Sequence, residues 1–342
     1  MMEMKYPPGD EEKVLILDGS VGDQLKRFQS IIELEPSIPY KDAFSNVCYA
    51  NIIYPDLVYE VHESYVNYCD VITTNSFGCT VKSLGKGNMQ VHRDEMVRKS
   101  CEIAKKAASS ATGRIPRVAG SVGPLGECYM SNCPTDVSME EEYGDLIRLL
   151  TAGGVDIILC ETISCIKEAV CACRQARKIA PEKMLWVSFT LDDTLSKANH
   201  GNCLLRSGES LELSVKSLIN ISSASHIGAI LVNCCHPKVA DVAVKTLSKT
   251  LKGTRIRYGA YANGFRCSTT EWIMQEYGKS NIDESRYLVS TQSTSTVFSA
   301  QEYADHAEQW VKDGATVVGG CCGVGPDHIR TLHRRLNHTC NE

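Results

Sequence analysis

The sequence predicts a single-domain (β/α)8 barrel, and two observations support this fold class. Eight short runs rich in β-branched residues recur along the chain, separated by amphipathic segments whose apolar residues fall at three- and four-residue spacings. Eight alternations of strand and helix favour a closed parallel barrel over an open doubly wound sheet. Such barrels commonly exceed 250 residues as one unit, so we expect these 342 residues to form one domain, 1–342, with an ordered core of about 13–336.

Each element follows from its local pattern. The expected strands are Val14–Leu17, Asp70–Thr74, Arg117–Ser121, Asp156–Cys160, Met184–Thr190, Gly228–Asn233, Arg257–Ala262 and Ala315–Gly320. The clearest helices between them are Pro55–Tyr68, Arg93–Ala108, Glu140–Leu150, Ile166–Ile179, Leu211–Ser222 and Ser299–Lys312. Pro55 and Pro326 suit a first helical turn, and Ser138 with Glu141 predicts a capping box.

Composition excludes several classes of protein. A hydrophobic fraction of 43% with 23% charged residues is that of a globular protein rather than a disordered one. The net charge of −5 provides no basic field for a phosphate backbone, so we expect no nucleic-acid partner. The first residues are polar and acidic, and the sequence has no apolar run of 18 residues, so we expect a cytoplasmic protein without membrane spans.

Seventeen cysteines in a chain of this kind indicate a reducing compartment rather than a disulfide framework. Most should be small buried hydrophobes. We place in that class the cysteines that lie in apolar or helical surroundings, namely Cys48, Cys69, Cys101, Cys160, Cys171, Cys173 and Cys203.

Barrel chemistry lies where strands end, and polar residues stand there in this sequence. The residues that end or directly follow the expected strands are Asp18, Thr74, Asn75, Ser121, Glu161, Asn233, Cys234, Asn263, Cys321 and Cys322. Adjacent cysteines at a strand end are poorly explained by packing, since Leu or Val would fill the space without an oxidisable group. Three thiolates at one barrel mouth suit Zn²⁺ with one open coordination position, where a substrate thiol would lose its proton and become a nucleophile.

Two alternatives remain open at this point. The Gly323-Val324-Gly325-Pro326 turn before a helix could instead cradle a phosphate, although this leaves the paired cysteines unexplained. A closed structural zinc site is the other possibility, with Cys235 or His236 as the fourth ligand.

With these motifs in place, the chain resembles the homocysteine S-methyltransferase family over nearly its whole length. The matching segments include Leu17-Asp18-Gly19, Val71-Ile72-Thr73-Thr74-Asn75, Val118 to Pro124, Glu161-Thr162, Asn233-Cys234 and Gly319-Gly320-Cys321-Cys322. The resemblance implies that Cys234, Cys321 and Cys322 bind Zn²⁺, that homocysteine is the methyl acceptor, and that Asp18 and Glu161 bind its amino group. Gly19, Thr74, Asn75, Ser121, Asn233 and Asn263 become further candidate contacts for this substrate.

The residues themselves allow other roles for some of these candidates. An acid at a barrel mouth can hold an ammonium group through charge-assisted hydrogen bonds. Asp18 before Gly19 could equally be a turn residue, and Glu161 could cap the following helix. Thr74 and Asn75 are as often local hydrogen-bonding residues as ligand contacts.

The sequence departs from the family where the methyl donor should bind. Phe44 stands where the family often has Trp, and Thr74-Asn75-Ser76-Phe77-Gly78 replaces Thr-Asn-Thr-Tyr-Gln. Because aromatic faces attract cationic methyl groups, Phe44 and Phe77 are the candidate donor residues.

The sequence also bears on the donor and on the oligomeric state. The C-terminal extension associated with betaine enzymes is missing, so we expect a sulfonium donor, S-methylmethionine before S-adenosylmethionine, and a monomer or weak dimer. Two alternatives are betaine-type donor specificity and a non-catalytic barrel that retains zinc.

Overall fold

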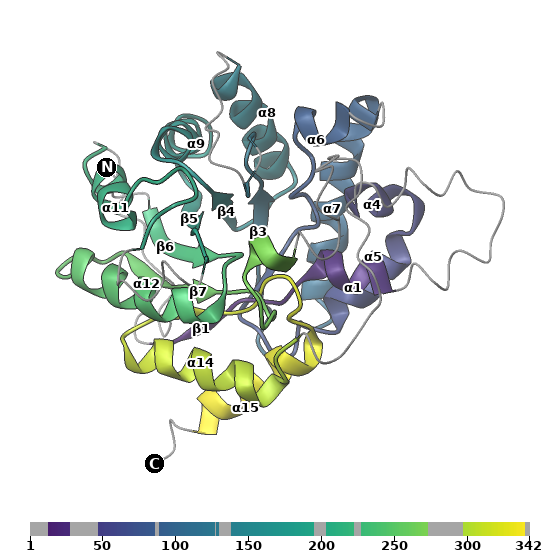
Figure 1. Ribbon diagram of the computed structural model, residues 1–342. Coiled ribbons are helices and arrows are strands. Elements are labelled where there is room, and N and C mark those ends of the chain that lie inside the picture. Colours follow the sequence, from purple (N-terminus) through teal and green to yellow (C-terminus); the bar gives the residue numbers. More distant parts are fainter. Residues whose placement is uncertain are drawn as a thin grey trace.

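The computed structural model describes residues 13–27, 47–85, 89–126, 128–129, 138–194, 203–221, 227–272 and 297–338. Within these ranges eight strands form one parallel sheet in the order β1-β8-β7-β6-β5-β4-β3-β2. A parallel bridge between Leu17 and Val71 joins the two outer strands, so the sheet closes on itself. The strands lie at the centre and the helices surround them (Figure 1). The predicted (β/α)8 barrel is therefore confirmed.

Each strand overlaps a run expected from sequence, but the bounds differ. Strand β4 continues to Ile163 instead of ending at Cys160, so Glu161 lies within it, and β8 is shorter than the expected Ala315–Gly320. They are β1 (Leu15–Ile16), β2 (Val71–Thr73), β3 (Arg117–Val122), β4 (Ile157–Ile163), β5 (Met184–Thr190), β6 (Ile227–Asn233), β7 (Arg257–Tyr261) and β8 (Val317–Val318).

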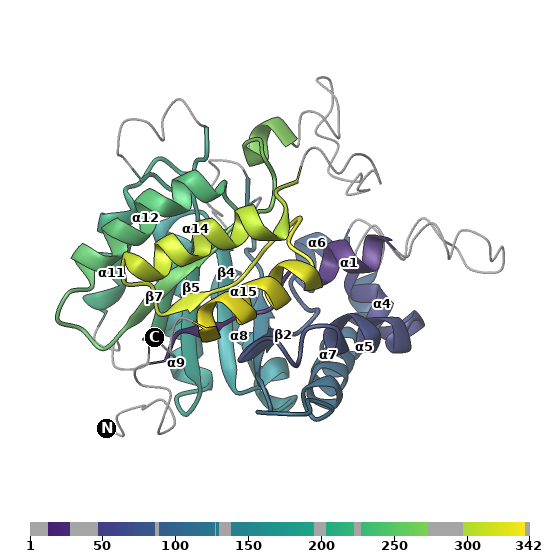
Figure 2. The same cartoon turned by 90° about the horizontal axis from the view of Figure 1, so that it is seen from below.

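The helices occupy the connections between the strands. They are α1 (Val21–Arg27), α4 (Ala50–Ile53), α5 (Pro55–Glu63), α6 (Val81–Gly85), α7 (Arg93–Ala108), α8 (Met139–Ala152), α9 (Ile166–Ile179), α11 (Leu211–Ile219), α12 (Pro237–Thr250), α14 (Ala300–Lys312) and α15 (Pro326–His338), with short 3-10 turns η1 (Val47–Tyr49) and η2 (Met89–His92). Figure 2 shows α12, α14 and α15 covering one side of the barrel.

Several helix ends differ from the prediction. Helix α8 spans Met139–Ala152 instead of Glu140–Leu150, and α14 begins at Ala300 instead of Ser299. Helix α5 ends at Glu63 instead of Tyr68, because the chain tightens there and Tyr65 N donates to His62 O at 3.0 Å. Helix α11 ends at Ile219 instead of Ser222.

The capping box predicted at Ser138 is wrong. An N-cap side chain needs extended backbone to reach the helix amides, but Ser138 is helical (φ −75°, ψ −7°) and its side chain makes no cap hydrogen bond. A capping box forms instead at α14, where Ser299 is extended (φ −65°, ψ 160°) and pairs with Glu302. Both segments have the sequence Ser-x-x-Glu, so the backbone conformation of the serine determines which segment forms the capping box.

The core has two layers because strand residues alternate in direction. One set fills the barrel interior: Leu15, Leu17, Val71, Ala119, Ile157, Leu159, Met184, Trp186, Ala229, Leu231, Tyr261 and Val317. Their neighbours along the strands, such as Ile158, Val187 and Ile230, pack outward against the helices. The interior layer forms the floor beneath the strand ends that carry the candidate site.

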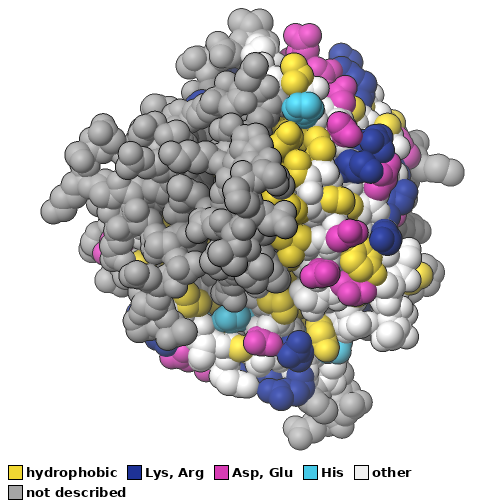
Figure 3. All heavy atoms as spheres, turned by 90° about the vertical axis from the view of Figure 1, so that its right-hand side faces the viewer, with side chains coloured by type: hydrophobic (Ala, Val, Ile, Leu, Met, Phe, Trp, Pro, Cys, Tyr) yellow, Lys and Arg dark blue, Asp and Glu magenta, His cyan; other side chains and the backbone are white. Residues whose placement is uncertain are grey.

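The surface of the described chain shows no strong charge asymmetry on the face drawn in Figure 3. Lysine and arginine side chains are interspersed there with aspartate and glutamate rather than gathered into a basic patch. In the described ranges, every helix is too short or too polar to span a bilayer.

The interior layer generates a first prediction. Trp186 is fully buried among the strands, so Trp186→Ala should leave a cavity and lower the free energy of unfolding by about 3–5 kcal/mol. Urea unfolding measures the change. Leu213→Ala on α11 is the control, because Leu213 is 54% exposed and its loss should change stability by no more than about 0.5 kcal/mol. Equal effects of the two substitutions would contradict the prediction.

Candidate metal and substrate site

Three cysteines meet at the carboxyl ends of β6 and β8. The Sγ atoms of Cys234, Cys321 and Cys322 all lie within 4.8 Å of one another, and those of Cys234 and Cys322 are 4.0 Å apart. Three thiolates that bind one tetrahedral Zn²⁺ at about 2.3 Å stand about 3.8 Å from each other. The cysteine trio therefore fits a zinc ion with little rearrangement.

The local backbone explains how two adjacent cysteines reach this position. A Cβ on Gly319 would lie 2.6 Å from Leu17 Cβ, and one on Gly320 would lie 2.0 Å from Val324 Cγ1. Two glycines are thus required where β8 passes β1 and turns back. Across the mouth, Cys234 has a left-handed backbone (φ 49°), which costs an L-residue about 1–2 kcal/mol.

Hydrogen bonds among the three thiols shift their pKa values. Hydrogen bonds from Cys321 and Cys322, with a further one from Tyr129, lower the pKa of Cys234 to about 5. The bond to Cys234 is the main cause that raises the pKa of Cys321. The trio therefore stabilises one negative charge on Cys234, and a divalent cation would favour loss of the remaining protons.

Two buried carboxylates stand at the same mouth. Asp18 accepts hydrogen bonds from Thr73 N at 2.7 Å and from Thr73 Oγ1 at 3.1 Å. Glu161 accepts one from the Ser121 hydroxyl and one from the Tyr261 hydroxyl at 2.9 Å. Burial raises the pKa of both acids, and the negative charge of Glu161 raises that of Asp18 further. An ammonium group would relieve this cost of burying negative charge.

Ser121 and Gly19 have structural roles at this mouth. Ser121 donates its hydroxyl to Glu161, so it fixes that carboxylate. A Cβ on Gly19 would lie 2.4 Å from Val324 O, so Gly19 permits close packing of two backbone segments.

Thr74 and Asn75 are engaged within the protein. Thr74 Oγ1 accepts from Ser121 N at 3.0 Å and lies 2.7 Å from Ser76 Oγ. Asn75 Nδ2 donates to Val47 O at 2.9 Å and to Asn51 Oδ1 at 3.0 Å. Both side chains hold the loop after β2, mostly through partners distant in the sequence.

Asn233 and Asn263 differ in their hydrogen bonds to the rest of the protein. Asn233 is fully engaged: its Oδ1 accepts from Ser188 Oγ at 2.7 Å and from Thr162 N at 3.1 Å, and its Nδ2 donates to Thr162 Oγ1 at 2.8 Å. It thereby holds the left-handed backbone of Thr162 (φ 62°) beside Glu161. Asn263 donates to Thr269 Oγ1 at 2.9 Å, while its buried Oδ1 has no hydrogen-bond partner among the described residues.

The geometry argues against a phosphate cradle at the start of α15. Gly323 N donates to Asp23 Oδ2 at 2.6 Å, Val324 N to Cys321 O at 3.0 Å, and Gly325 N to the His328 ring at 3.2 Å. The amides that would bind an anion are thus occupied, one of them by a carboxylate.

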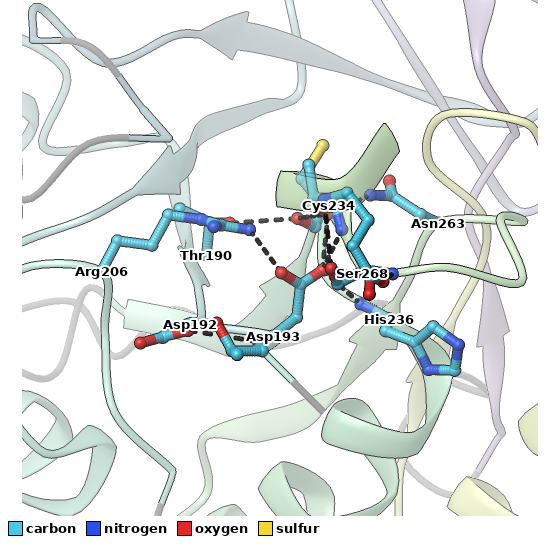
Figure 4. A network of polar contacts seen from close by, with 11 residues as sticks. Thr190, Asp192, Asp193, Arg206, Cys234, His236, Asn263 and Ser268 are labelled. Atoms are coloured by element: carbon cyan, nitrogen blue, oxygen red, sulfur yellow. Dashed lines mark hydrogen bonds and ion pairs between the residues drawn. The ribbon is translucent and has the colours of Figure 1, made fainter. Parts of the chain in front are cut away.

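A closed zinc site gains no support from the two proposed fourth ligands. Cys235 belongs to the fully buried layer beneath the helices and is not among the converging sulfurs. The two ring nitrogens of His236 contact Lys238 N at 3.1 Å and Arg266 O at 3.3 Å. In Figure 4 the imidazole points away from Cys234.

The candidate donor residues are only partly described. Phe77 follows β2 and is 38% exposed, so its ring is accessible to a ligand. Phe44 lies outside the described residues.

Sequence reasoning missed several residues of this region. It assigned nothing to the end of β5, where the fully buried Asp193 forms an ion pair with Arg206, although two aspartates near the end of a strand were a visible signal. It also missed Tyr261, which donates to Glu161, and Tyr129, which contacts Cys234. The other described cysteines have free thiols, except Cys165, which is disulfide-bonded; the expectation of reduced cysteines is therefore wrong at Cys165.

Comparison with known families and structures agrees with this site. The family model described as homocysteine S-methyltransferase matches residues 15–336. The chain belongs to the homocysteine S-methyltransferase family. Its relatives include a betaine-homocysteine S-methyltransferase of Drosophila melanogaster, 23% identical over 304 residues that cover 83% of this chain and 84% of that protein. They also include homocysteine S-methyltransferase 2 of Zea mays, 23% identical over 310 residues that cover 84% of this chain and 82% of that protein.

Among solved structures, the chain is similar to the homocysteine methyltransferase MmuM of Escherichia coli in its metallated form. The TM-score is 0.69 at 21% sequence identity, over 95% of this chain and 97% of the other. At this identity the likeness shows a shared fold.

Proposed function

We propose that this protein transfers a methyl group from a sulfonium donor to the thiol of homocysteine, giving methionine, with one Zn²⁺ held by Cys234, Cys321 and Cys322. The observation that carries the proposal is the convergence of these three thiols beside two buried carboxylates at one barrel mouth. Family membership supports the same reaction class.

Bound zinc would lower the pKa of a substrate thiol and leave one position for it. The other requirements fall on the chain itself. Asp18 and Glu161 would bind the substrate ammonium, while Ser121 and Tyr261 hold Glu161 in one orientation. The unpaired Oδ1 of Asn263 is a further acceptor for that amine. These contacts fix the amino acid so that its sulfur faces the donor methyl.

In the transfer, the substrate sulfur forms a bond to the methyl carbon as the bond from that carbon to the donor sulfur breaks. The donor sulfur keeps the electron pair and leaves as a neutral thioether, and the thiol proton passes to solvent. S-methylmethionine is the first expected donor and S-adenosylmethionine the second. Because one relative is named for betaine and another only for homocysteine, the family does not choose between donors.

The test is a donor panel with homocysteine as acceptor. Methionine formation should be fastest with S-methylmethionine and negligible with betaine. A zinc-loaded protein that forms no methionine with any donor would favour the alternative of a non-catalytic zinc barrel.

We also propose that the protein acts in the cytoplasm, where free thiols stay reduced. A monomer or weak dimer remains our prediction for its assembly.

The ligand set generates a second prediction. Purified protein should contain about one zinc per chain, and Cys321→Ala should lose most of it, because two thiolates hold the ion far less tightly than three. Metal analysis by mass spectrometry measures the content. Cys235→Ala is the matched control: this neighbour of Cys234 is equally buried but outside the trio, so zinc should stay near wild type. Full zinc occupancy in Cys321→Ala would refute the assignment.

The acids generate a third prediction. Asp18→Asn and Glu161→Gln each remove a charge-assisted hydrogen bond worth about 1.5–3 kcal/mol, so the homocysteine KM should rise about ten- to a hundredfold. Zinc content should stay near wild type. Tyr261→Phe should raise the same KM by a smaller factor, because it frees Glu161 without removing its charge. Unchanged homocysteine kinetics in both acid variants would assign the carboxylates a structural role.

A fourth prediction concerns the donor. Phe77→Leu keeps an apolar side chain but removes the aromatic ring, whose attraction for a cation is worth about 0.5–2 kcal/mol, so the donor KM should rise several-fold. The homocysteine KM should barely change. Steady-state kinetics with each substrate varied in turn gives the ratio of the two effects, and Phe44→Leu is tested in the same way. Equal effects on both substrates, or none, would show that the donor does not contact these rings.

A further inference from the structure

The reaction proposed above leaves unused a fully buried aspartate beneath the cysteine trio. Asp193 follows β5 and has no solvent exposure. Its Oδ1 pairs with Arg206 Nη2 at 3.2 Å. Its Oδ2 accepts three further hydrogen bonds, from His236 N at 3.1 Å, Thr269 N at 2.8 Å and Thr269 Oγ1 at 2.6 Å. One carboxylate thus ties together the segments that follow β5, β6 and β7.

A second branch of the same network reaches Cys234 directly. The Arg206 side chain is 5% exposed, and its Nε donates to Thr190 Oγ1 at 3.4 Å. Thr190 Oγ1 in turn donates to the Cys234 carbonyl at 3.1 Å. Because the arginine occupies an acceptor position on the hydroxyl, the hydroxyl proton is directed to Cys234. Figure 4 shows Arg206, Thr190 and Asp193 gathered at the backbone of Cys234, with its sulfur turned away from them.

This arrangement matters because the backbone of Cys234 is unfavourable by itself. Its φ of 49° lies in the left-handed region, which a non-glycine residue keeps only where its surroundings impose it. The network holds the chain at and just after Cys234, through the Cys234 carbonyl and through the amide of His236. That conformation directs the sulfur toward Cys321 and Cys322.

We infer that Asp193 and Arg206 are positioning residues that preorganise Cys234 for metal binding, an inference that rests on the proposed role of the trio as zinc ligands. Neither residue belongs to the cysteine trio. They act through Thr190 and through the backbone around Cys234, as supporting hydrogen bonds commonly do around metal ligands.

Asp193→Asn is the most direct variant. All four partners of the carboxylate are donors, so either orientation of the amide places its NH₂ group against a donor. The zinc dissociation constant, measured by competition with a chromophoric chelator, should rise about ten- to a hundredfold. Thr190→Val removes the hydroxyl that bonds to Arg206 and to the Cys234 carbonyl but leaves the bonds of Asp193 in place, so its rise should be smaller. If Asp193→Asn fails to fold, the zinc dissociation constant of Thr190→Val tests the inference in its place.

Asp70→Asn is the matched control. Asp70 is also buried, accepts from Ile16 N at 2.9 Å and pairs with Lys13 at 2.6 Å, but it precedes β2 at the opposite end of the barrel. It should lower thermal stability without weakening zinc binding. Zinc affinities of Asp193→Asn and Thr190→Val equal to that of Asp70→Asn would overturn the inference.

A second readout needs no metal. In the zinc-free protein, hydrogen exchange of the peptide around 233–236 should accelerate in Asp193→Asn and not in Asp70→Asn, whereas general destabilisation would accelerate exchange throughout. Exchange unchanged at this peptide would overturn the inference. Failure of the wild-type protein to bind zinc would refute the proposed function instead, so the two failures are distinguishable.

Discussion

The close approach of β8 to β1 is the constraint on which the site depends. The two strands pair in parallel, and the chain then turns so sharply that a side chain on Gly319 or Gly320 would overlap Leu17 or Val324. This turn places Cys321 and Cys322 on the inner rim of the barrel, opposite Cys234. A wider turn would leave the sulfurs too far apart to share one ion.

Negative charge is concentrated at the same rim. Asp18 and Glu161 are buried acids whose pKa values are raised by the loss of solvent, and Cys234 has a pKa lowered by its neighbouring thiols. Hydrogen bonds from Thr73, Ser121 and Tyr261 offset part of the cost. A site with this electrostatic balance favours cations: a divalent metal at the sulfurs, an ammonium at the acids, and a positively charged methyl donor.

Many polar side chains of the site hold other residues of the protein in position. Asn233, a candidate substrate contact, holds the left-handed backbone at Thr162 beside Glu161. Cys234 also has a left-handed backbone, and hydrogen bonds from Thr190 to its carbonyl and from the His236 amide to Asp193 hold the chain there. Thr162 thus stands next to the acid Glu161, and Cys234 is itself a proposed metal ligand. Each of these two left-handed residues is held by a buried polar network. Strain of this type persists where the surrounding structure imposes it.

The sequence by itself determined the barrel, its strands, the convergence of three cysteines and the acids beside them. These follow from local patterns: β-branched runs mark strands, and the parallel fold brings all strand ends to one rim. Tertiary structure alone decided how each polar side chain is used. Thr74, Asn75 and Asn233 resemble ligand contacts in sequence, yet their partners are distant segments such as β3, α4 and β4. Ser138 and Ser299 share one motif, but only the backbone of Ser299 lets it cap. Hydrogen bonds between residues far apart in the chain have no local signature. The aspartates after β5 are visible in the sequence, but the pairing of Asp193 with Arg206 emerged only from the fold.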